Sequence, residues 1–302
     1  MNAIIQCQQL AKRFGSKTVL QQLSFELQQG DVAALIGPNG AGKTTLFSIL
    51  CGYLPPDSGS ARIFGHKAGS SALFGKVAAL PQDAQFDPAF SIGEQLDFYG
   101  RLQGLSSKAA REESKRVLAL VELTEQLQHK AGALSHGMRK RAAIAQAFIG
   151  TPQLVLLDEP TAGLDPVNAL HIRQLISRLS GEVSFMISSH NIFELEQLCN
   201  NVLYLEQGQL KQHSSNDNVA QLQYLTLHLE QDNNDAISAA LRQLPGLIEL
   251  HHAQRRELVL SYNPQHNADF DLAVLQCLAA NGWRYRNLTK GQTLEQKLFN
   301  PA

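Results

Sequence analysis

The sequence predicts a parallel α/β domain that is followed by a smaller α+β domain. Short apolar runs at 31–36, 154–157 and 183–187 are separated by segments of helical periodicity, a pattern typical of parallel strands that helices cover on both faces. A polar stretch at 211–221 then separates these runs from a second series of strand-like and helical patterns. A change of composition of this kind marks a boundary between domains.

The composition is that of a folded, globular chain with balanced charge. Of the 302 residues, 44% are hydrophobic and 18% are charged, with 26 lysines and arginines against 27 aspartates and glutamates. A net charge of -1 supplies no bulk attraction to phosphate polymers or to anionic lipid. We therefore expect no nucleic acid among the partners, and we expect any membrane association to depend on a partner protein.

The cysteines and the apolar segments set limits on location. Cys7, Cys51, Cys199 and Cys277 form no CxxC pair, which argues against a zinc site or a disulfide framework and suits a reducing cytosol. No window approaches the roughly 18 to 20 uninterrupted apolar residues that a membrane helix requires. The sequence thus predicts a chain that does not cross the bilayer by itself and has no secretory signal at its start.

The first domain is predicted to occupy residues 1–212. Residues 19–27 alternate apolar and polar side chains like a half-buried strand, and the apolar strand at 31–36 ends at Gly37. Helical spacing over 91–150 predicts a helical subdomain at about 88–150, inserted before the strands at 154–157 and 183–187. A linker is predicted at 213–222.

The second domain is predicted at 223–302, with the element order βαββαβ. Strand-like patterns at 224–229, 247–250, 257–262 and 283–287 alternate with helical patterns at 235–244 and 270–280. This order is that of a split βαβ, ferredoxin-like domain. His251 and His252 lie near Glu249, but neighbouring residues of a strand point to opposite faces, so we predict no metal site there.

The segment between the strand at 31–36 and the helical run at 46–50 matches GxxxxGK[ST], the phosphate-binding loop. Its residues are Gly37, Pro38, Asn39, Gly40, Ala41, Gly42, Lys43, Thr44 and Thr45. The glycines let main-chain N–H groups turn toward phosphate oxygens, and the following helix directs its positive end at the same place. Lys43 would add a charge, Thr44 a hydroxyl ligand for Mg2+, and Thr45 a contact to the α-phosphate. The alternative is a plain glycine-rich turn before a helix; the strand and helix on either side favour the phosphate-binding loop.

Two acidic residues follow the apolar strand at 154–157. Asp158 ends this strand at the carboxyl edge of the sheet, where the phosphate-binding loop also lies, and is expected to bind Mg2+ directly or through water. Glu159 lies one residue further, on the opposite side of the strand, and is a candidate general base for the water that attacks the γ-phosphate. By themselves the two acids would indicate only a solvated strand end. Beside the phosphate-binding loop they complete a predicted site for a nucleotide and Mg2+.

His190 follows the strand at 183–187 through Ser188 and Ser189. A histidine at a strand end is usually an ordinary surface or capping residue. In the predicted site it could instead contact the γ-phosphate or orient the water. Spacing alone leaves both interpretations open.

Together these motifs resemble those of the ATP-binding subunits of ABC transporters, over residues 4 to about 210. Three further segments carry the resemblance, at 80–82 (LPQ), 134–138 (LSHGM) and 162–166 (AGLDP). They are similar to the family's Q-loop, signature motif and D-loop, and His190 stands at its switch histidine. The resemblance implies that Gln82 links Mg2+ and the catalytic water to the helical insertion. It also implies that Phe14 stacks on the adenine ring, which an aromatic face favours.

The segment at 134–138 departs from the commonest form of the family's signature, LSGGQ, at His136 and Met138. Ser135 is placed to cap the helical run that follows, whose N-terminus attracts an anion, and Gly137 permits close approach of the main chain. In the family, that anion is the γ-phosphate of ATP bound to the other subunit. Ser135 as a simple N-cap is the plain alternative, and the two interpretations are compatible.

The resemblance implies an ATPase that works as a head-to-tail homodimer, peripheral to the cytoplasmic face of the inner membrane. The exposed side of the helical subdomain would receive a helix of a separate integral membrane permease. The LS-x-G-M signature and a C-terminal appendage of about 90 residues are similar to those of exporters of the ABC-2 type. The alternatives are a soluble or regulatory ABC-type ATPase without a permease, one acting on ribosomes or DNA, and a subunit of an importer.

Overall fold

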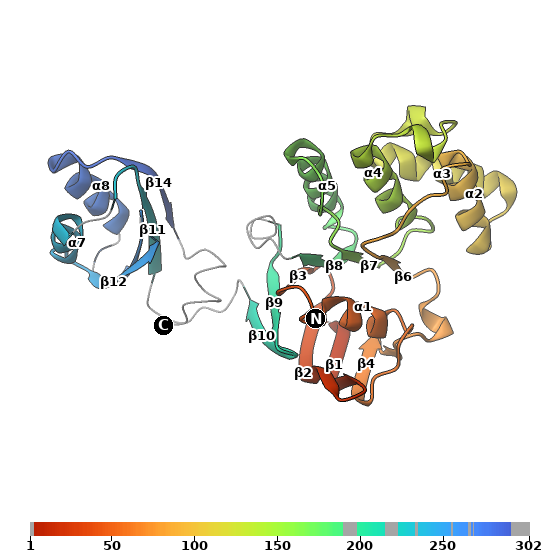
Figure 1. Cartoon of the computed structure of the whole chain (residues 1–302), viewed down its shortest axis with the longest axis horizontal. Coiled ribbons are helices and arrows are strands. Elements are labelled where there is room, and N and C mark those ends of the chain that lie inside the picture. The colour runs from red at the N-terminus through yellow and green to blue at the C-terminus, as the bar shows by residue number, and fades with distance from the viewer. Residues whose placement is uncertain are drawn as a thin grey trace. The chain divides into compact units, whose positions relative to one another are not determined.

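The computed structural model describes residues 3–189, 198–214, 223–232, 235–254, 256–264, 267 and 269–290. The chain divides into two compact units, Met1–Ser215 and Asn216–Ala302, whose elements are labelled in Figure 1. Each unit has a hydrophobic core of its own. Among the described residues, no helix is long and apolar enough to span a membrane.

A six-stranded sheet forms the centre of the N-terminal unit. Its strands are β3 (Val32–Ile36), β6 (Val77–Leu80), β7 (Leu154–Asp158), β8 (Ser184–Ser189), β9 (Asn201–Glu206) and β10 (Gln209–Ser214). They lie in the order β10-β9-β3-β8-β7-β6. Neighbours from β9 to β6 are parallel, and β10 pairs antiparallel with β9 at the edge. The predicted parallel sheet is therefore confirmed, with β6, β9 and β10 as strands that the sequence patterns did not indicate.

A second, antiparallel sheet lies beside the first in the N-terminal unit (Figure 1). Its strands are β1 (Ala3–Phe14), β2 (Lys17–Gln28), β4 (Ser58–Ile63) and β5 (His66–Lys67), in the order β2-β1-β4-β5. The strand predicted at 19–27 is the middle of β2. Helix α1 (Lys43–Leu50) contacts both β4 and β7, and Ile5, Leu35 and Leu46 bring β1, β3 and α1 into one apolar core. This packing fixes the loop before α1 at the edge of the central sheet.

The described residues of the N-terminal unit also form the helices of the insertion and one helix after β7. They are α2 (Ile92–Leu102), α3 (Ser107–Leu120), α4 (His136–Gln146) and α5 (Pro166–Leu179), with short 3-10 turns at Ser71–Leu73, Thr124–Gln126 and Ala131–Ala133. Each α-helix here begins after a side chain that caps it, namely Ser91, Ser106, Ser135 and Asp165. Such a cap accepts a hydrogen bond from a first-turn N–H group and so sets the start of the helix.

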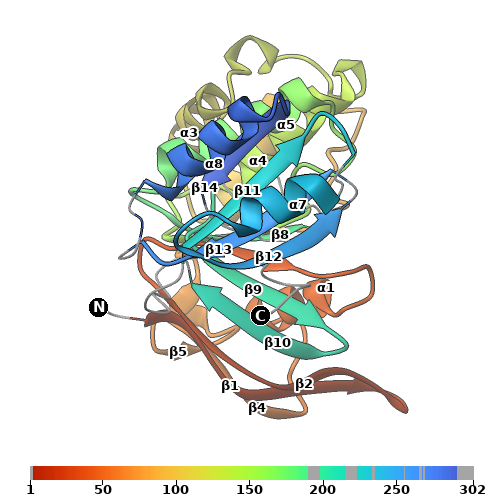
Figure 2. The same ribbon diagram turned by 90° about the vertical axis from the view of Figure 1, so that its left-hand side faces the viewer.

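In its described residues, the C-terminal unit forms a four-stranded antiparallel sheet with two helices on one face (Figure 2). Its elements are β11 (Gln223–Leu229), α7 (Asp235–Arg242), β12 (Leu247–Gln254), β13 (Glu257–Tyr262), α8 (Phe270–Ala280) and β14 (Tyr285–Lys290). The strand order is β12-β13-β11-β14, and neighbours are antiparallel. The rings of Tyr262 and Phe270 stack in its core with centroids 4.6 Å apart. The predicted order βαββαβ is confirmed, and the sheet order is that of a split βαβ fold.

Several element boundaries differ from the predictions. β10 pairs with β9 as far as Ser214, so the linker predicted to begin at 213 starts two residues too early. A strand at the edge of a sheet tolerates polar residues, so a polar run there gives no sign of a strand. In addition, β12 continues to Gln254 and β14 begins at Tyr285. The rest of the predicted linker, 215–222, lies outside the described residues.

Candidate nucleotide-binding site

The loop at 37–42 connects β3 to α1 at the carboxyl edge of the central sheet. Gly40 and Gly42 have φ angles of 79° and 109°, a left-handed conformation that favours glycine. A Cβ atom on Gly37 would lie 2.1 Å from the main-chain oxygen of Leu205, so this position excludes a side chain. Gly42 is the N-cap of α1, and no side chain at this position accepts hydrogen bonds from the first N–H groups of the helix. These N–H groups can therefore bind an anion.

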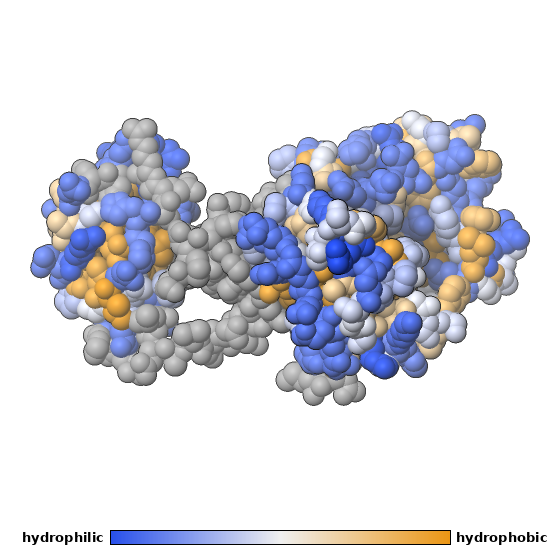
Figure 3. All heavy atoms as spheres, turned by 60° about the horizontal axis from the view of Figure 1, so that its bottom comes forward, coloured by the Kyte–Doolittle hydropathy of each residue, from blue (hydrophilic) through white to orange (hydrophobic). Residues whose placement is uncertain are grey.

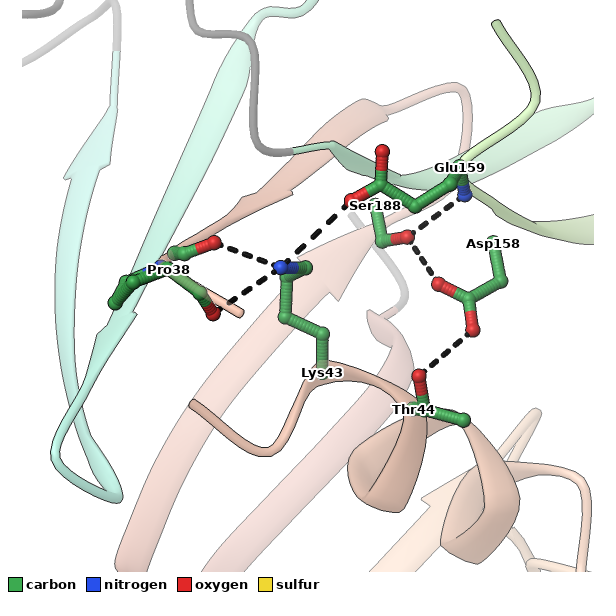
Figure 4. A network of polar contacts seen from close by, with 7 residues as sticks. Pro38, Lys43, Thr44, Asp158, Glu159 and Ser188 are labelled. Carbon is green, nitrogen blue, oxygen red and sulfur yellow. Dashed lines mark hydrogen bonds and ion pairs between the residues drawn. The ribbon is translucent and has the colours of Figure 1, made fainter. Parts of the chain in front are cut away.

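Lys43 lies inside this loop, with 7% of its surface exposed. Its Nζ donates hydrogen bonds to the main-chain oxygens of Gly37 at 2.7 Å and of Pro38 at 3.3 Å. The same Nζ lies 3.7 Å from Oε1 of Glu159 (Figure 4). The ammonium group therefore bridges the phosphate-binding loop and the acid that follows β7. A buried charge requires such partners, because desolvation without them is costly.

Thr44 and Asp158 meet beside Lys43. Thr44 Oγ1 donates to Asp158 Oδ2 at 2.9 Å, and Oγ of Ser188, from β8, donates to Asp158 Oδ1 (Figure 4). A hydroxyl and a carboxylate oxygen are the hard donors that Mg2+ prefers, so the residues present fit the predicted metal ion. Ser188 is a site residue that sequence reasoning missed, since it belongs to no motif.

Glu159 follows β7 in a left-handed conformation, with φ at 49°. A residue other than glycine adopts this conformation at a cost of about 1–3 kcal/mol. Its N–H group donates to the main-chain oxygen of Ser188 at 3.2 Å and to Ser188 Oγ at 2.9 Å, which holds the turn in place. The Glu159 carboxylate is thereby directed toward Lys43. Strain that neighbouring bonds maintain is typical of functional sites.

A cavity of about 430 Å³ lies over these residues. It is lined by Phe14, Lys17, Val19, Asn39, Gly40, Gly42, Lys43, Thr44, Thr45, Gln82, Asp158 and Glu159. Four separate parts of the sequence thus meet around one space, whose volume suits a small organic ligand. Lys17 and Val19 are lining residues that sequence reasoning did not find, because no motif includes them.

Phe14 ends β1 and presents an aromatic ring to this cavity, with half of its surface exposed. Nζ of Lys12 lies 5.8 Å from the centroid of the ring. Lys12 is itself fixed by hydrogen bonds to the main-chain oxygen of Pro55 and to Asp57, both at 2.8 Å. Because a cation is attracted to an aromatic face, Lys12 restrains the ring at the place where a base would stack on it.

Two loop residues support the site from outside the cavity lining. The N–H group of Ala41 donates to the main-chain oxygen of Pro38 at 3.1 Å, which closes a turn inside the loop. Ala41 is buried in the core beneath it. Pro38 and Ala41 therefore shape the loop, and their predicted contact with the nucleotide stays a prediction.

Ser135 and Gly137 do not line the cavity of their own chain. Ser135 Oγ accepts a hydrogen bond from the N–H group of Met138 at 3.2 Å, so its role as N-cap of α4 is confirmed. A Cβ atom on Gly137 would lie 2.5 Å from the side chain of Asn168, so a larger residue there would require Asn168 of α5 to move. His190, the predicted switch histidine, lies outside the described residues.

Gln82 lines the cavity and is joined to the helical insertion by Lys140 of α4. Nζ of Lys140 donates to the main-chain oxygen of Gln82 at 3.0 Å. Burial lowers the pKa of Lys140, and the negative charges of Asp158, Glu159 and Asp83 oppose this shift. Lys140 therefore lies next to the site, and no sequence motif indicated it.

Neither the cysteines nor the histidines of β12 form a second reactive centre. Burial raises the pKa of the Cys51 thiol to about 12, with a smaller contribution from the charge of Asp158, so this thiol stays protonated. His251 pairs with Glu249 at 3.0 Å, whereas His252 lies 3.3 Å from Oγ of Ser238 on α7. The two histidines thus point to opposite faces, and the described residues contain no group of three or more His, Cys, Asp or Glu side chains that could hold a metal ion.

The fold and the cavity define a nucleotide-binding domain of the P-loop class, with a phosphate-binding loop and two acids at the edge of a parallel sheet. Comparison with known proteins narrows this class. The family model of the ABC transporter matches residues 20–162. The chain is 33% identical over 210 residues to the linearmycin resistance ATP-binding protein LnrL of Bacillus subtilis, covering 68% of each chain. It is 38% identical over 210 residues to the Nod factor export ATP-binding protein I of Burkholderia lata, covering 68% of this chain and 69% of that protein.

The chain therefore belongs to the ABC transporter family of ATP-binding proteins. A solved ATP-binding cassette, a dimer in a post-hydrolysis state with ADP and Pi bound, has a TM-score of 0.63 to it. That structure is 22% identical in sequence, and the match covers 70% of this chain and 98% of that one. The predicted fold class, an α/β domain of the ABC ATPase type, is confirmed.

Proposed function

We propose that this protein is the ATP-hydrolysing subunit of an exporter and energises transport through a separate membrane permease. The observation that carries the proposal is the continuous polar network at the cavity. Thr44 bonds Asp158, Ser188 bonds both Asp158 and the main chain of Glu159, and Glu159 pairs with Lys43 (Figure 4). A cation, a metal-binding pair and a base are the groups that ATP hydrolysis requires.

ATP would lie with its adenine on Phe14 and its phosphates in the loop. The N–H groups at the start of α1 and Nζ of Lys43 would bind the β- and γ-phosphates, and Thr45 would reach the α-phosphate. Phosphate oxygens offer Lys43 shorter, charge-assisted bonds than the 3.7 Å contact with Glu159. Nucleotide binding would therefore weaken the Lys43–Glu159 pair and let the carboxylate turn to the catalytic water.

Hydrolysis then depends on Glu159 as general base. Thr44 and Asp158, together with Gln82, would hold Mg2+, which when bound neutralises charge on the phosphate oxygens. Glu159 accepts a proton from the water that attacks the γ-phosphorus, and the bond from that phosphorus to the β–γ bridging oxygen breaks, with ADP as the leaving group. His190 would contact the γ-phosphate or orient the water.

A second copy of the chain would complete the site. Ser135 is exposed at the N-terminus of α4, outside the cavity of its own chain, and the first turn of α4 carries no acidic residue. The N–H groups of such a helix end attract an anion. In a head-to-tail homodimer, Ser135 and Gly137 would contact the γ-phosphate that the other copy holds. The dimeric state of the cassette with the same fold supports this arrangement.

A permease would dock on an apolar surface between the helical insertion and the edge of the central sheet. Two hollows of about 270 and 260 Å³ share Phe74, Val77 and Ala79. Phe74 is 69% exposed, and Leu102 of α2, in the first hollow, is 61% exposed. Figure 3 shows one face on which hydrophobic patches interrupt a largely hydrophilic N-terminal unit. Apolar side chains gathered in a hollow are typical of protein–protein contacts.

The names of the relatives support export as the direction of transport. The two named relatives are a resistance protein and an export protein, which supports export by this chain as well. With no membrane-spanning helix among its described residues, the protein would act as a peripheral subunit on the cytoplasmic face of the inner membrane, held there by the permease.

The variant Glu159→Gln tests whether Glu159 is the general base of ATP hydrolysis. The amide preserves the size of the side chain but is a poor proton acceptor, so turnover should fall on the order of 10²- to 10⁴-fold. ATP binding should persist, and ATP-dependent dimers should accumulate, because hydrolysis no longer separates them. Single-turnover hydrolysis, nucleotide titration and size-exclusion chromatography measure the three properties. Glu125→Gln, at an exposed position of the insertion, is the control. Undiminished ATPase activity in Glu159→Gln would refute the general-base assignment.

Co-purification from detergent-solubilised membranes tests whether a membrane permease binds this protein. A polytopic protein should accompany the parent chain, and Phe74→Asp should weaken that association without changing the basal ATPase activity. Ile248→Asp, at a position of similar exposure on β12, controls for a general effect of an added surface charge. A chain that purifies alone with full ATPase activity would support the alternative of a soluble ATPase.

A further inference from the structure

Lys140 occupies a place in the site that the proposed mechanism does not use. It lies on α4, shortly after the signature residues Ser135 and Gly137, and its side chain reaches back to the Q-loop. Its Nζ donates to the main-chain oxygen of Gln82 at 3.0 Å, although the two residues are 58 positions apart. One lysine therefore ties the signature helix to the loop that carries Gln82 into the cavity.

The electrostatic surroundings hold the ammonium group in this place. Asp158, Glu159 and Asp83 all attract the charge of Lys140, and the first two line the same cavity as Gln82. A hydrogen bond from a charged donor is roughly twice as strong as one between neutral groups. The bond to Gln82 thus lies beside three carboxylates, whose attraction opposes the effect of burial on the ammonium group.

The Q-loop itself is thinly anchored within the described part of the chain. It leaves β6 after Leu80, and a main-chain bond from Ala84 to Pro81, at 3.2 Å, closes its turn. Gln82 and both of its neighbours are exposed. A segment with exposed hydrogen bonds and few buried contacts opens readily, so one charge-assisted bond strongly affects where Gln82 lies.

We propose that Lys140 is a positioning residue for ATP hydrolysis, which holds the Q-loop main chain against α4 so that Gln82 faces the cavity. This inference rests on the proposed function, because Lys140 acts through Gln82. It goes beyond that function by giving a role to a side chain outside every motif. The same bond also connects α4, whose first residues would serve the ATP of the second copy, to the loop that serves this chain's own ATP.

Replacement of the lysine separates positioning from nucleotide binding. Lys140→Met keeps a long apolar stem and removes the donor, so kcat should fall on the order of tenfold through misplacement of Gln82. KM, and the Kd of a non-hydrolysable ATP analogue, should stay within about twofold, because the phosphate-binding loop is intact. Lys140→Arg restores a charged donor and should recover most of kcat. Lys115→Met, at an exposed lysine of α3 that pairs with Glu112, is the matched control and should match the parent.

A double-mutant cycle with Gln82→Ala tests whether Lys140 affects kcat through Gln82. If Lys140 acts through Gln82, Lys140→Met should cause no further loss of kcat in the Gln82→Ala background. Parental kcat in Lys140→Met, additive losses in the cycle, or an equal loss in Lys140→Arg would each overturn the proposal. If Lys140→Met fails to fold on thermal melting, Lys140→Leu, which also lacks a donor, replaces it with the same expected results. A parent that hydrolyses no ATP would refute the proposed function itself, whereas an active parent with an unaffected variant refutes only the role of Lys140.

Discussion

At the scale of single residues, the site is held together by buried charges that are partners of one another. Lys43 and Glu159 are 7% and 5% exposed, and Asp158 is 3% exposed. Asp158 accepts hydrogen bonds from Thr44 and Ser188, and Lys43 donates to main-chain oxygens of the loop. Because burial of an unpaired charge is costly, each group depends on the others for its place. Substitutions here should therefore change more than one property of the site.

Lys43→Ala should weaken nucleotide binding itself. The substitution removes the only charge that the loop at 37–45 directs at the phosphates, and hydrogen bonds to charged groups contribute about 1.5–3 kcal/mol each, so the Kd for ATP should rise at least tenfold. Equilibrium titration with a fluorescent ATP analogue measures this change. Lys108→Ala, at an exposed position of α3, should bind like the parent. A Lys43→Ala variant with the parental Kd would contradict the assignment of the loop.

Ser188→Ala should destabilise the unit and disturb the metal site. Ser188 is fully buried, and its hydroxyl bonds both Asp158 and the N–H group of Glu159. Loss of a buried hydrogen-bond partner costs about 1–3 kcal/mol, which urea unfolding would detect, and half-maximal ATPase activity should need more Mg2+. Ser180→Ala, where the hydroxyl bonds only within the exposed end of α5, should change stability by less than about 0.5 kcal/mol. Equal effects in the two variants would contradict this role of Ser188.

The motif residues of the site could be predicted from the sequence, whereas Ser188 and Lys140 could not. The phosphate-binding loop is local, since its glycines, Lys43 and Thr44 follow one another and their chemistry depends on that order. Ser188 meets Asp158 across 30 positions and Lys140 meets Gln82 across 58. Contacts of this kind depend on which strands and helices become neighbours in the fold. Local sequence patterns do not predict which elements these are.

At the scale of elements, the antiparallel sheet was the part least visible in the sequence. The pairing of β1 with β2 is interrupted by register shifts, and so is its pairing with β4 between Gln8 and Ala11. Gln9 and Gln22, which lie in β1 and β2, have φ angles of 49°. Each bulge moves the following side chains to the other face of the strand. The alternation that predicts a strand is therefore broken in β1, although the strand is 12 residues long.

Gly59→Ala tests whether one of these bulges requires glycine. A Cβ atom on Gly59 would lie 2.2 Å from the main-chain oxygen of Gln9, and its φ angle is 77°. The left-handed strain and the clash together should cost about 2–4 kcal/mol of unfolding free energy. Gly65→Ala has the same φ of 77° with no atom within 4 Å of the added carbon, so it should cost only about 1–2 kcal/mol. Urea denaturation of both variants isolates the clash, and equal losses would contradict it.

At the scale of the whole molecule, the order of the two units and the type of each could be predicted, but the limits of the first could not. The change to polar residues after 210 marked a boundary, and the alternation in 223–290 indicated the βαββαβ order. The polar strand β10 concealed the end of the central sheet, since its pairing with β9 depends on main-chain bonds that any residue but proline makes. The two separate cores suggest that the two units are stable independently.

Phe270→Ala tests that independence. The ring is fully buried and stacks on Tyr262 at 4.6 Å, and loss of a buried phenylalanine costs about 3–5 kcal/mol, a large part of the 5–15 kcal/mol that stabilises a typical domain. Calorimetry of the parent should resolve two unfolding transitions, one for each unit. In the variant, only the transition of the C-terminal unit should move to a lower temperature or disappear. The Kd for an ATP analogue should not change, because the nucleotide cavity is lined entirely by residues of the N-terminal unit. Leu272→Ala, at a 53% exposed position of the same helix, should leave both transitions in place. A parallel fall of both transitions in Phe270→Ala, or a loss of nucleotide binding, would show that the two units do not fold independently.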